Sequence, residues 1–178
     1  MRAGRRAAAR AAIFLVLAEL LFKSLPVAKT TVRVDTLTAP ARGYTQDTVT
    51  LGWEERLRAR ARRQSDGGFE FATTLRRGTV LREEDCFVFE PQNRVIRVVE
   101  LEEPMLVVRP LSNREWGLFA YHIGNSHQPM MITDEAIVCP DALGMDQILK
   151  YHAIPFARER RPFTPVGQVS DHQHQISR

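Results

Sequence analysis

Apolar and polar positions alternate with a period of two along much of the first half of the chain. Short runs of this kind, separated by turn residues, cover 31–34, 78–81, 86–89 and 95–99, and each predicts a strand. Successive side chains of a strand point to opposite faces, so the alternation indicates a sheet with one face in solvent. We therefore predict a β-meander domain over residues 29–104.

A basic stretch inside this domain follows the same period. Between residues 57 and 62 small apolar side chains alternate with arginines, residues 66–68 are Asp-Gly-Gly, and alternation resumes at 69–71. This pattern predicts a β-hairpin with Arg58, Arg60 and Arg62 in solvent. A nucleic-acid-binding row of arginines is the alternative interpretation. Acidic residues close by, and the lack of alternating aromatic residues that would stack on bases, make it the weaker one.

In the second half of the chain, segments with the spacing of helices stand between segments with the alternation of strands. A helix is expected after an N-cap at Ser112 or Asn113, with Gly124 and Asn125 as its stop signal. The predicted elements are a strand at 105–108, this first helix, strands at 129–132 and 136–138, a helix at 142–151 and a strand at 154–157. This β-α-β-β-α-β order is the ferredoxin-like topology. The fold class is therefore α+β, with a β-meander domain followed by a ferredoxin-like domain.

The domain boundaries follow from these changes of pattern. The ferredoxin-like domain covers residues 105–161, and residues 162–178, rich in proline, glycine, glutamine and serine, predict a disordered tail. Residues 1–28 form an N-terminal extension whose apolar run is interrupted by Glu19, is too short to span a membrane and lacks an A-x-A cleavage site. Three interpretations stay open for it: a helical extension that is not cleaved, a weak export or transit signal, and translation from a start codon upstream of the authentic one.

The net charge of +4 is confined to the beginning of the chain. Residues 1–24 carry five basic side chains and one acidic one, and the other 154 residues have equal numbers of both signs. A body without net charge has no field that attracts a polyanion, so we expect no nucleic-acid partner.

Signatures of enzymes are missing from the sequence. It contains no G-x-S-x-G, P-loop, dinucleotide-binding or H-E-x-x-H motif, and the three adjacent acids at 83–85 suit a solvated turn better than a catalytic pair. Cys86 and Cys139 belong to no C-x-x-C pair and are expected to be small buried side chains in a reducing, cytoplasmic location. The chain is predicted to be a binding protein and not an enzyme.

The five histidines all lie in the last third of the chain. His122, inside the first helix, is expected to be buried with a hydrogen-bonded ring, and His152 to close the second helix, where a cation favours the helix dipole. His127 follows the helix stop and is expected at the surface. His172 and His174 form an H-x-H pair in the tail. On spacing alone, metal binding and incidental composition remain equally good interpretations of this pair.

A longer motif favours metal binding. Residues 121–129 read Tyr-His-Ile-Gly-Asn-Ser-His-Gln-Pro, which resembles the Tyr-His-Leu/Ile-Gly-Asn-Arg-His-x-Pro motif of the urease accessory nickel chaperone family, UreE. Residues 75–82 and 106–109 are similar to two further segments of that family, and the resemblance covers roughly residues 45–165. It implies a β domain followed by a ferredoxin-like domain.

The resemblance also implies a function. His127 would be the main ligand of Ni²⁺ and would meet its copy across the two-fold axis of a homodimer, with His172 and His174 as accessory ligands. Partners would be an accessory GTPase and apo-urease assembled with other accessory proteins. Zn²⁺ or Cu²⁺ would also bind in vitro, because nitrogen ligands do not select nickel over them. Ligation needs neutral imidazole, so nickel affinity is expected to fall as the pH drops through about 6.5, the ordinary value for histidine.

Departures from the family pattern narrow this expectation. Ser126 replaces the usual arginine, Arg76 the usual proline, and the tail has only two histidines, so few nickel ions per dimer are expected. The main alternative is a protein-binding adaptor of an assembly complex that recognises partners through its β domain and binds metal incidentally. A membrane-anchored or exported protein and an RNA-binding ferredoxin-like domain are weaker alternatives, since the strands lack the aromatic and basic signature of that RNA-binding module.

Overall fold

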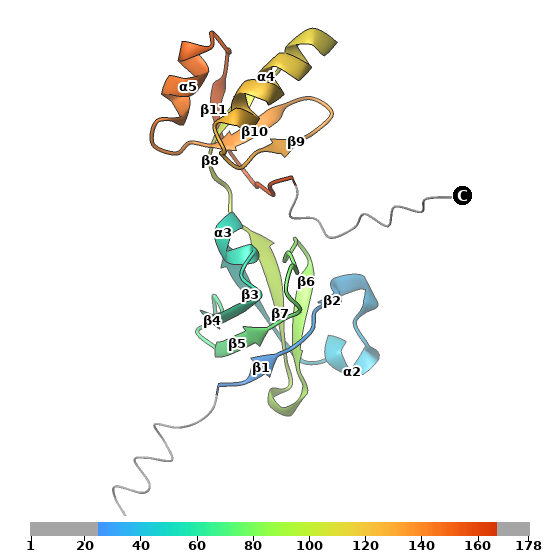
Figure 1. Ribbon diagram of the computed structural model, residues 1–178. Coiled ribbons are helices and arrows are strands. Elements are labelled where there is room, and N and C mark those ends of the chain that lie inside the picture. The colour runs from blue at the N-terminus through green and yellow to red at the C-terminus, as the bar shows by residue number, and fades with distance from the viewer. Residues whose placement is uncertain (1–24, 167–178) are drawn as a thin grey trace, which may run out of the picture.

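The computed structural model describes residues 25–166 and shows two lobes (Figure 1). The N-terminal lobe is built almost wholly of strands, and the C-terminal lobe combines strands with two longer helices. The predicted α+β class, with a β domain first, is therefore confirmed.

The N-terminal lobe contains two sheets and several single-turn helices. One sheet has the strand order β1-β5-β4 and the other the order β2-β6-β7-β3. The strands are β1 Val27–Ala28, β2 Val32–Arg33, β3 Thr45–Leu51, β4 Arg60–Gln64, β5 Glu70–Thr74, β6 Asp85–Phe89 and β7 Arg94–Glu100. The short helices are η1 Val34–Thr36, α2 Ala39–Arg42, α3 Trp53–Arg56 and η2 Glu90–Gln92.

This lobe is not the predicted meander. Strand β3 pairs with β7 in parallel over seven residues, and β1 pairs with β5 in parallel, so only β4–β5 and β6–β7 are hairpins. The prediction was wrong because a period of two identifies a strand but not its partner. It also missed β3, and it placed a strand at 78–81, where the chain forms a turn and extended loop instead.

The basic hairpin is confirmed as β4–β5. Arg58, Arg60 and Arg62 are all exposed, as predicted. Gly68 has a φ of +85°, the left-handed conformation that the turn requires and that glycine adopts without strain. Arg63, whose neighbours are exposed, is instead buried, and its Nη2 donates to the carbonyl oxygens of Glu55 and Arg58 at 2.9 Å each.

Two carboxylates fasten the turn of this hairpin to β3. Asp47 accepts hydrogen bonds from the Ser65 hydroxyl at 2.6 Å and the Gly67 amide at 3.0 Å, and Arg94 Nη1 lies 3.0 Å from it. Asp66 accepts from the Thr48 hydroxyl at 2.5 Å. These bonds join the two sheets at one end of the lobe.

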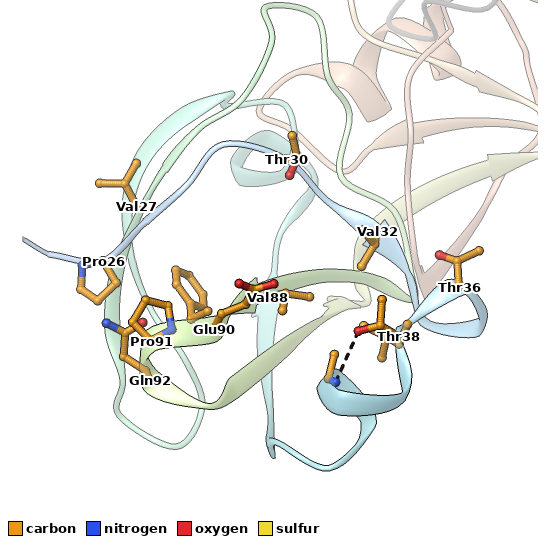
Figure 2. A pocket seen from close by; sticks show the side chains of 13 residues that line it. Pro26, Val27, Thr30, Val32, Thr36, Thr38, Val88, Glu90, Pro91 and Gln92 are labelled. Carbon is orange, nitrogen blue, oxygen red and sulfur yellow. Dashed lines mark hydrogen bonds between the residues drawn. The ribbon is translucent and has the colours of Figure 1, made fainter.

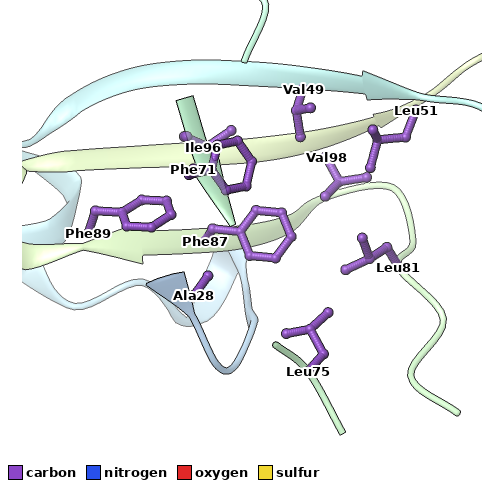
Figure 3. Packing of buried hydrophobic residues seen from close by; sticks show 10 residues of the cluster. All are labelled: Ala28, Val49, Leu51, Phe71, Leu75, Leu81, Phe87, Phe89, Ile96 and Val98. Atoms are coloured by element: carbon purple, nitrogen blue, oxygen red, sulfur yellow. The ribbon is translucent and has the colours of Figure 1, made fainter. Parts of the chain in front are cut away.

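The core of the N-terminal lobe is an aromatic and aliphatic cluster between the sheets (Figure 3). Phe71 and Phe87 are completely buried, with ring centroids 5.4 Å apart, and Phe89 contacts Phe71 edge-on at the same distance. Each fully buried side chain of this size contributes roughly 1.5–3 kcal/mol to the free energy of unfolding. The lobe therefore has a core of its own.

The C-terminal lobe is a four-stranded antiparallel sheet with the order β11-β8-β10-β9. Its elements are β8 Glu103–Val108, α4 Asn113–Asn125, β9 Met131–Ile132, β10 Ile137–Pro140, α5 Met145–Tyr151 and β11 Ala157–Arg161. Ser112 is the N-cap of α4, and its hydroxyl accepts a hydrogen bond from the Glu115 amide, one of the two caps predicted. The last strand begins three residues later than predicted.

Both faces of this sheet are covered. Leu106 and Val108 of β8 pack with α4 and α5 on one face. Met105 and Val107, on the opposite face, pack against Phe163. The chain from residue 162 to 166, which we call the strap, thus supplies the second layer, and Phe163 has no exposed surface. The predicted disordered tail therefore starts too early, because one aromatic among polar residues and prolines did not reveal a packed segment.

Candidate metal centre

Helix α4 presents His127 at its C-terminal end. The helix continues through the predicted stop residues, Ser126 is its C-cap, and His127 follows with a φ of +54°. Gly124 lies inside the helix instead of ending it, and a Cβ there would make an ordinary contact with Met130 Cε at 3.5 Å. His127 therefore occupies the left-handed position after a helix where glycine or asparagine usually stands.

This placement has a cost and a chemical consequence. A residue with a Cβ in the left-handed region is strained by about 1 kcal/mol or more, and such strain concentrates at functional positions. The amide of His127 donates to Gly124 O at 3.0 Å, which closes the last turn, while its side chain is exposed, as predicted. The free carbonyl groups at a helix C-terminus carry partial negative charge, so a cation beside this imidazole is favoured.

The other two described histidines pair with each other. His122 of α4 and His152, the C-cap of α5, stack with ring centroids 3.8 Å apart. Tyr121 and Tyr151 contact these rings edge-on. His152 closes its helix as predicted. His122 is only half-buried and its ring packs on an aromatic partner, so the expected buried position is wrong.

One face of α4 carries exposed apolar side chains. Leu118 is 45% exposed and Tyr121 63% exposed, one helical turn apart on the way to the C-terminus. The helix that ends at His127 therefore also carries exposed apolar side chains.

The strap places the start of the tail close to His127. The Val166 amide donates to Met130 O at 2.7 Å, and Met130 is three residues beyond His127. His172 and His174 lie outside the described residues, six and eight positions after Val166. An extended chain spans about 3.3–3.6 Å per residue. The six residues from Val166 to His172 therefore span up to roughly 20 Å, and the three from His127 to Met130 at most about 11 Å. Both tail histidines can therefore reach His127.

The cysteines are not suited to metal binding at neutral pH. Both are buried, as predicted. Burial raises the pKa of the Cys86 thiol to about 11 and that of Cys139 to about 12. Metal ligation uses the thiolate, which is scarce at neutral pH when the pKa is so high.

Residues 25–166 contain neither a preformed metal-binding cluster nor a membrane-spanning helix. No three side chains of histidine, cysteine, aspartate or glutamate gather there in a metal-binding group. Within the same part of the chain, no helix is long and apolar enough to cross a membrane.

A separate recess of about 490 Å³ lies in the N-terminal lobe (Figure 2). Its lining, part apolar and part polar, comes from β1 and the segment after it, from β2, η1 and α2, and from the end of β6 and η2. Val27, Val32, Val88 and Pro91 are among the apolar residues labelled in the figure. Thr38, on its wall, caps α2 by accepting a hydrogen bond from the Ala41 amide. The recess holds no histidine and is distinct from the surface around His127.

Comparison with known proteins agrees with the motif in residues 121–129. The profile of the UreE urease accessory protein N-terminal domain matches residues 30–100, and that of its C-terminal domain matches residues 103–178. The chain is 32% identical over 130 residues to a urease accessory protein UreE of Nostoc punctiforme, which covers 71% of this chain and 86% of the relative. It is 31% identical over 140 residues to that of Azorhizobium caulinodans (72% and 67%), and 26% identical over 128 residues to that of Bacillus cereus (72% and 84%). The chain therefore belongs to the UreE urease accessory protein family, a family of accessory proteins and not of enzymes.

Proposed function

We propose that this protein is a metallochaperone that binds Ni²⁺ and delivers it to apo-urease during urease maturation. It works as a cytoplasmic homodimer. Its second domain is ferredoxin-like, and His127 of each subunit holds the metal. The observation that carries the proposal is the strained, exposed position of His127 at the C-terminus of α4. Glycine would adopt this left-handed conformation with less strain, so the fold itself does not require a histidine there.

A dimer supplies the donors that one imidazole lacks. Nickel prefers several nitrogen and oxygen ligands, and an isologous interface doubles every ligand. The exposed apolar side chains of Leu118 and Tyr121 on α4 suit such a contact. Burying them against a second copy would place both α4 helices, and the His127 that follows each, at one interface.

The tail adds ligands that can leave. The exit of the tail beside Met130 keeps His172 and His174 within reach of a metal on His127. Tethered ligands raise the effective concentration of donors and can dissociate one at a time. That behaviour fits a carrier that passes its metal through an accessory GTPase to apo-urease and its other accessory proteins.

Isothermal titration of nickel into the untagged full chain tests the metal site. The expected result is one tight binding event per two chains in the wild type and its loss in His127→Ala, with light scattering showing a dimer in both. Tight binding in the variant, or a stoichiometry that does not require two chains, would contradict the proposal.

A second candidate function is an adaptor that binds partner peptides through the β domain, and the recess in that domain, with its apolar and polar walls, favours it (Figure 2). The two candidates differ in what they need from His127. A His127→Ala variant that still supports full urease maturation at limiting nickel would favour the adaptor.

A further inference from the structure

The β4–β5 hairpin leaves one edge of its sheet open. In the strand order β1-β5-β4, β4 is the outer strand (Figure 1), and none of the residues that the structure describes pairs with its far side as a further strand. Such an edge presents backbone N–H and C=O groups to which a strand of another chain can bind.

The register of the hairpin shows which residues face the open edge. The Leu75 amide donates to Ala59 O at 2.8 Å, so these two residues form a hydrogen-bonded pair just before β4. In an antiparallel ladder, hydrogen-bonded pairs alternate with pairs whose backbone groups point away from each other. The even-numbered residues of β4 therefore turn their backbone N–H and C=O groups to the open edge, and these are Arg60, Arg62 and Gln64.

The arginines of this edge lie on the outer face of the sheet without acidic partners. Arg60 and Arg62 are exposed, and the residues directly opposite them on β5 are Thr74 and Ala72. Among residues 25–166, neither arginine forms an ion pair. Both guanidinium groups are therefore available to carboxylates from outside the chain.

Three further arginines extend the positive charge beyond the strand. Arg76 and Arg77 follow β5 at the end of the hairpin where β4 begins, and both are exposed. Arg58, also exposed, precedes β4 and lies 3.9 Å from Glu54. In the described part of the chain this is the only ion pair that these arginines make, so the beginning of the hairpin has an excess of positive charge.

The charge and the open edge together favour an acidic peptide as the occupant. Like charges oppose the pairing of two copies of this edge, whereas carboxylates of an incoming strand would lie opposite the arginines. Side chains on one face recur every second residue, roughly 6.4–6.8 Å apart, in both strands. A nucleic acid fits less well, because its phosphates only accept hydrogen bonds and cannot satisfy the outward C=O groups, and none of these residues is an aromatic platform for bases.

We propose that the outer edge of β4 is a docking site for an extended, acidic segment of a partner protein. The segment adds a strand beside β4, its backbone pairs with Arg60, Arg62 and Gln64, and its alternate carboxylates lie opposite the arginines. Main-chain hydrogen bonds supply the affinity, and the carboxylates supply the specificity. The site is in the N-terminal lobe and does not depend on nickel, so it goes beyond the proposed function.

The test uses the full chain without nickel and two synthetic peptides. One peptide alternates glutamate with threonine, and the other carries glutamine in place of each glutamate. By fluorescence anisotropy, the glutamate peptide is expected to bind at least about fivefold more tightly. Its binding should also slow amide hydrogen exchange at Arg60, Arg62 and Gln64 by about tenfold or more. Failure of the glutamate peptide to bind, equal affinity of the two peptides, or unchanged exchange at these amides would overturn the proposal.

Charge reversal separates docking from an effect on folding. The variant Arg60→Glu/Arg62→Glu should lose the glutamate peptide and bind instead a peptide with lysine at the same positions, which an unfolded protein would not do. The control Arg114→Glu reverses an exposed arginine of the other lobe and should bind as the wild type does. A reversal variant without preference for the lysine peptide, or an equal loss of binding in the control, would overturn the proposal.

A single-stranded oligothymidylate tests the nucleic-acid alternative. It is expected to bind the wild-type chain more weakly than the glutamate peptide and to leave exchange at the outward amides of β4 unchanged. Tighter binding of the oligonucleotide that is lost in Arg60→Glu/Arg62→Glu would overturn the assignment to an acidic peptide.

Discussion

The two helices of the C-terminal lobe end in similar ways but leave their histidines in different states. Helix α4 places His127 itself in the left-handed position, with φ +54°, whereas α5 places Ala153 there, with φ +53°, one residue after His152. The ring of His152 is then stacked on His122, while that of His127 is exposed. A shift of one residue relative to the helix end thus decides whether an imidazole packs or stays available to a ligand.

The difference shows why residue type alone does not identify the metal ligand. A histidine beside a helix C-terminus is favoured in both places by the helix dipole. Among the described histidines, only the one at the end of α4 itself takes the left-handed backbone conformation. His152 is thus packed against another ring, whereas the ring of His127 is open to a ligand.

The largest expected effect is on urease maturation at limiting nickel. His127→Ala should reduce the urease activity obtained by at least about tenfold, since losing a ligand costs more than losing a group that orients one. His152→Ala should leave maturation close to wild type. The measurement is urease activity in cells expressing each variant, and added nickel should relieve the defect. Equal defects in the two variants would break the comparison.

A second prediction tests whether a loss of nickel binding simply reflects a loss of folding stability. Asp47→Asn removes a charged acceptor of hydrogen bonds in the N-terminal lobe, far from every described histidine, and should lower the free energy of unfolding by roughly 1.5–3 kcal/mol. Nickel affinity under native conditions should be unchanged. Chemical denaturation and nickel titration of the same sample check both parts, and weaker nickel binding here would show that affinity simply follows stability.

Asp47 also makes the stability of the protein depend on pH in the acid range. Burial alone would raise the pKa of Asp47, but its hydrogen bonds and the charge of Arg94 hold the pKa below its ordinary value of 3.8. A carboxylate with a lowered pKa contributes stability above pH 3.8 and loses it as the pH falls through the folded value. Denaturation curves should show stability falling below about pH 4, and less steeply in Asp47→Asn. A wild-type curve that is flat in this range would contradict the assignment.

The smallest expected effect concerns backbone strain at the two helix ends. Glycine adopts the left-handed region freely, so His127→Gly and Ala153→Gly should each raise the free energy of unfolding by about 0.5–1 kcal/mol. Only His127→Gly should lose nickel binding. Thermal unfolding and nickel titration of both variants provide the check. A His127→Gly protein less stable than wild type would show that the histidine serves the fold.

Local patterns predicted the local structure well and the long-range structure poorly. The cap at Ser112 and the hairpin around residues 66–68 follow from neighbouring residues, and both were found. The parallel pairing of β3 with β7 joins segments about fifty residues apart and left no signal in either. The sequence did not single out Arg56 as a buried residue, because burial of a cation depends on acceptors that only the fold brings together.

The most direct test of the central claim is the position of the nickel itself. Crystals of the nickel-loaded full chain, measured at the nickel absorption edge, would locate the metal by its anomalous signal. One peak is expected at the contact between two copies of the chain, beside both His127 side chains. A peak on the stacked pair of His122 and His152, or within a single chain away from His127, would contradict it.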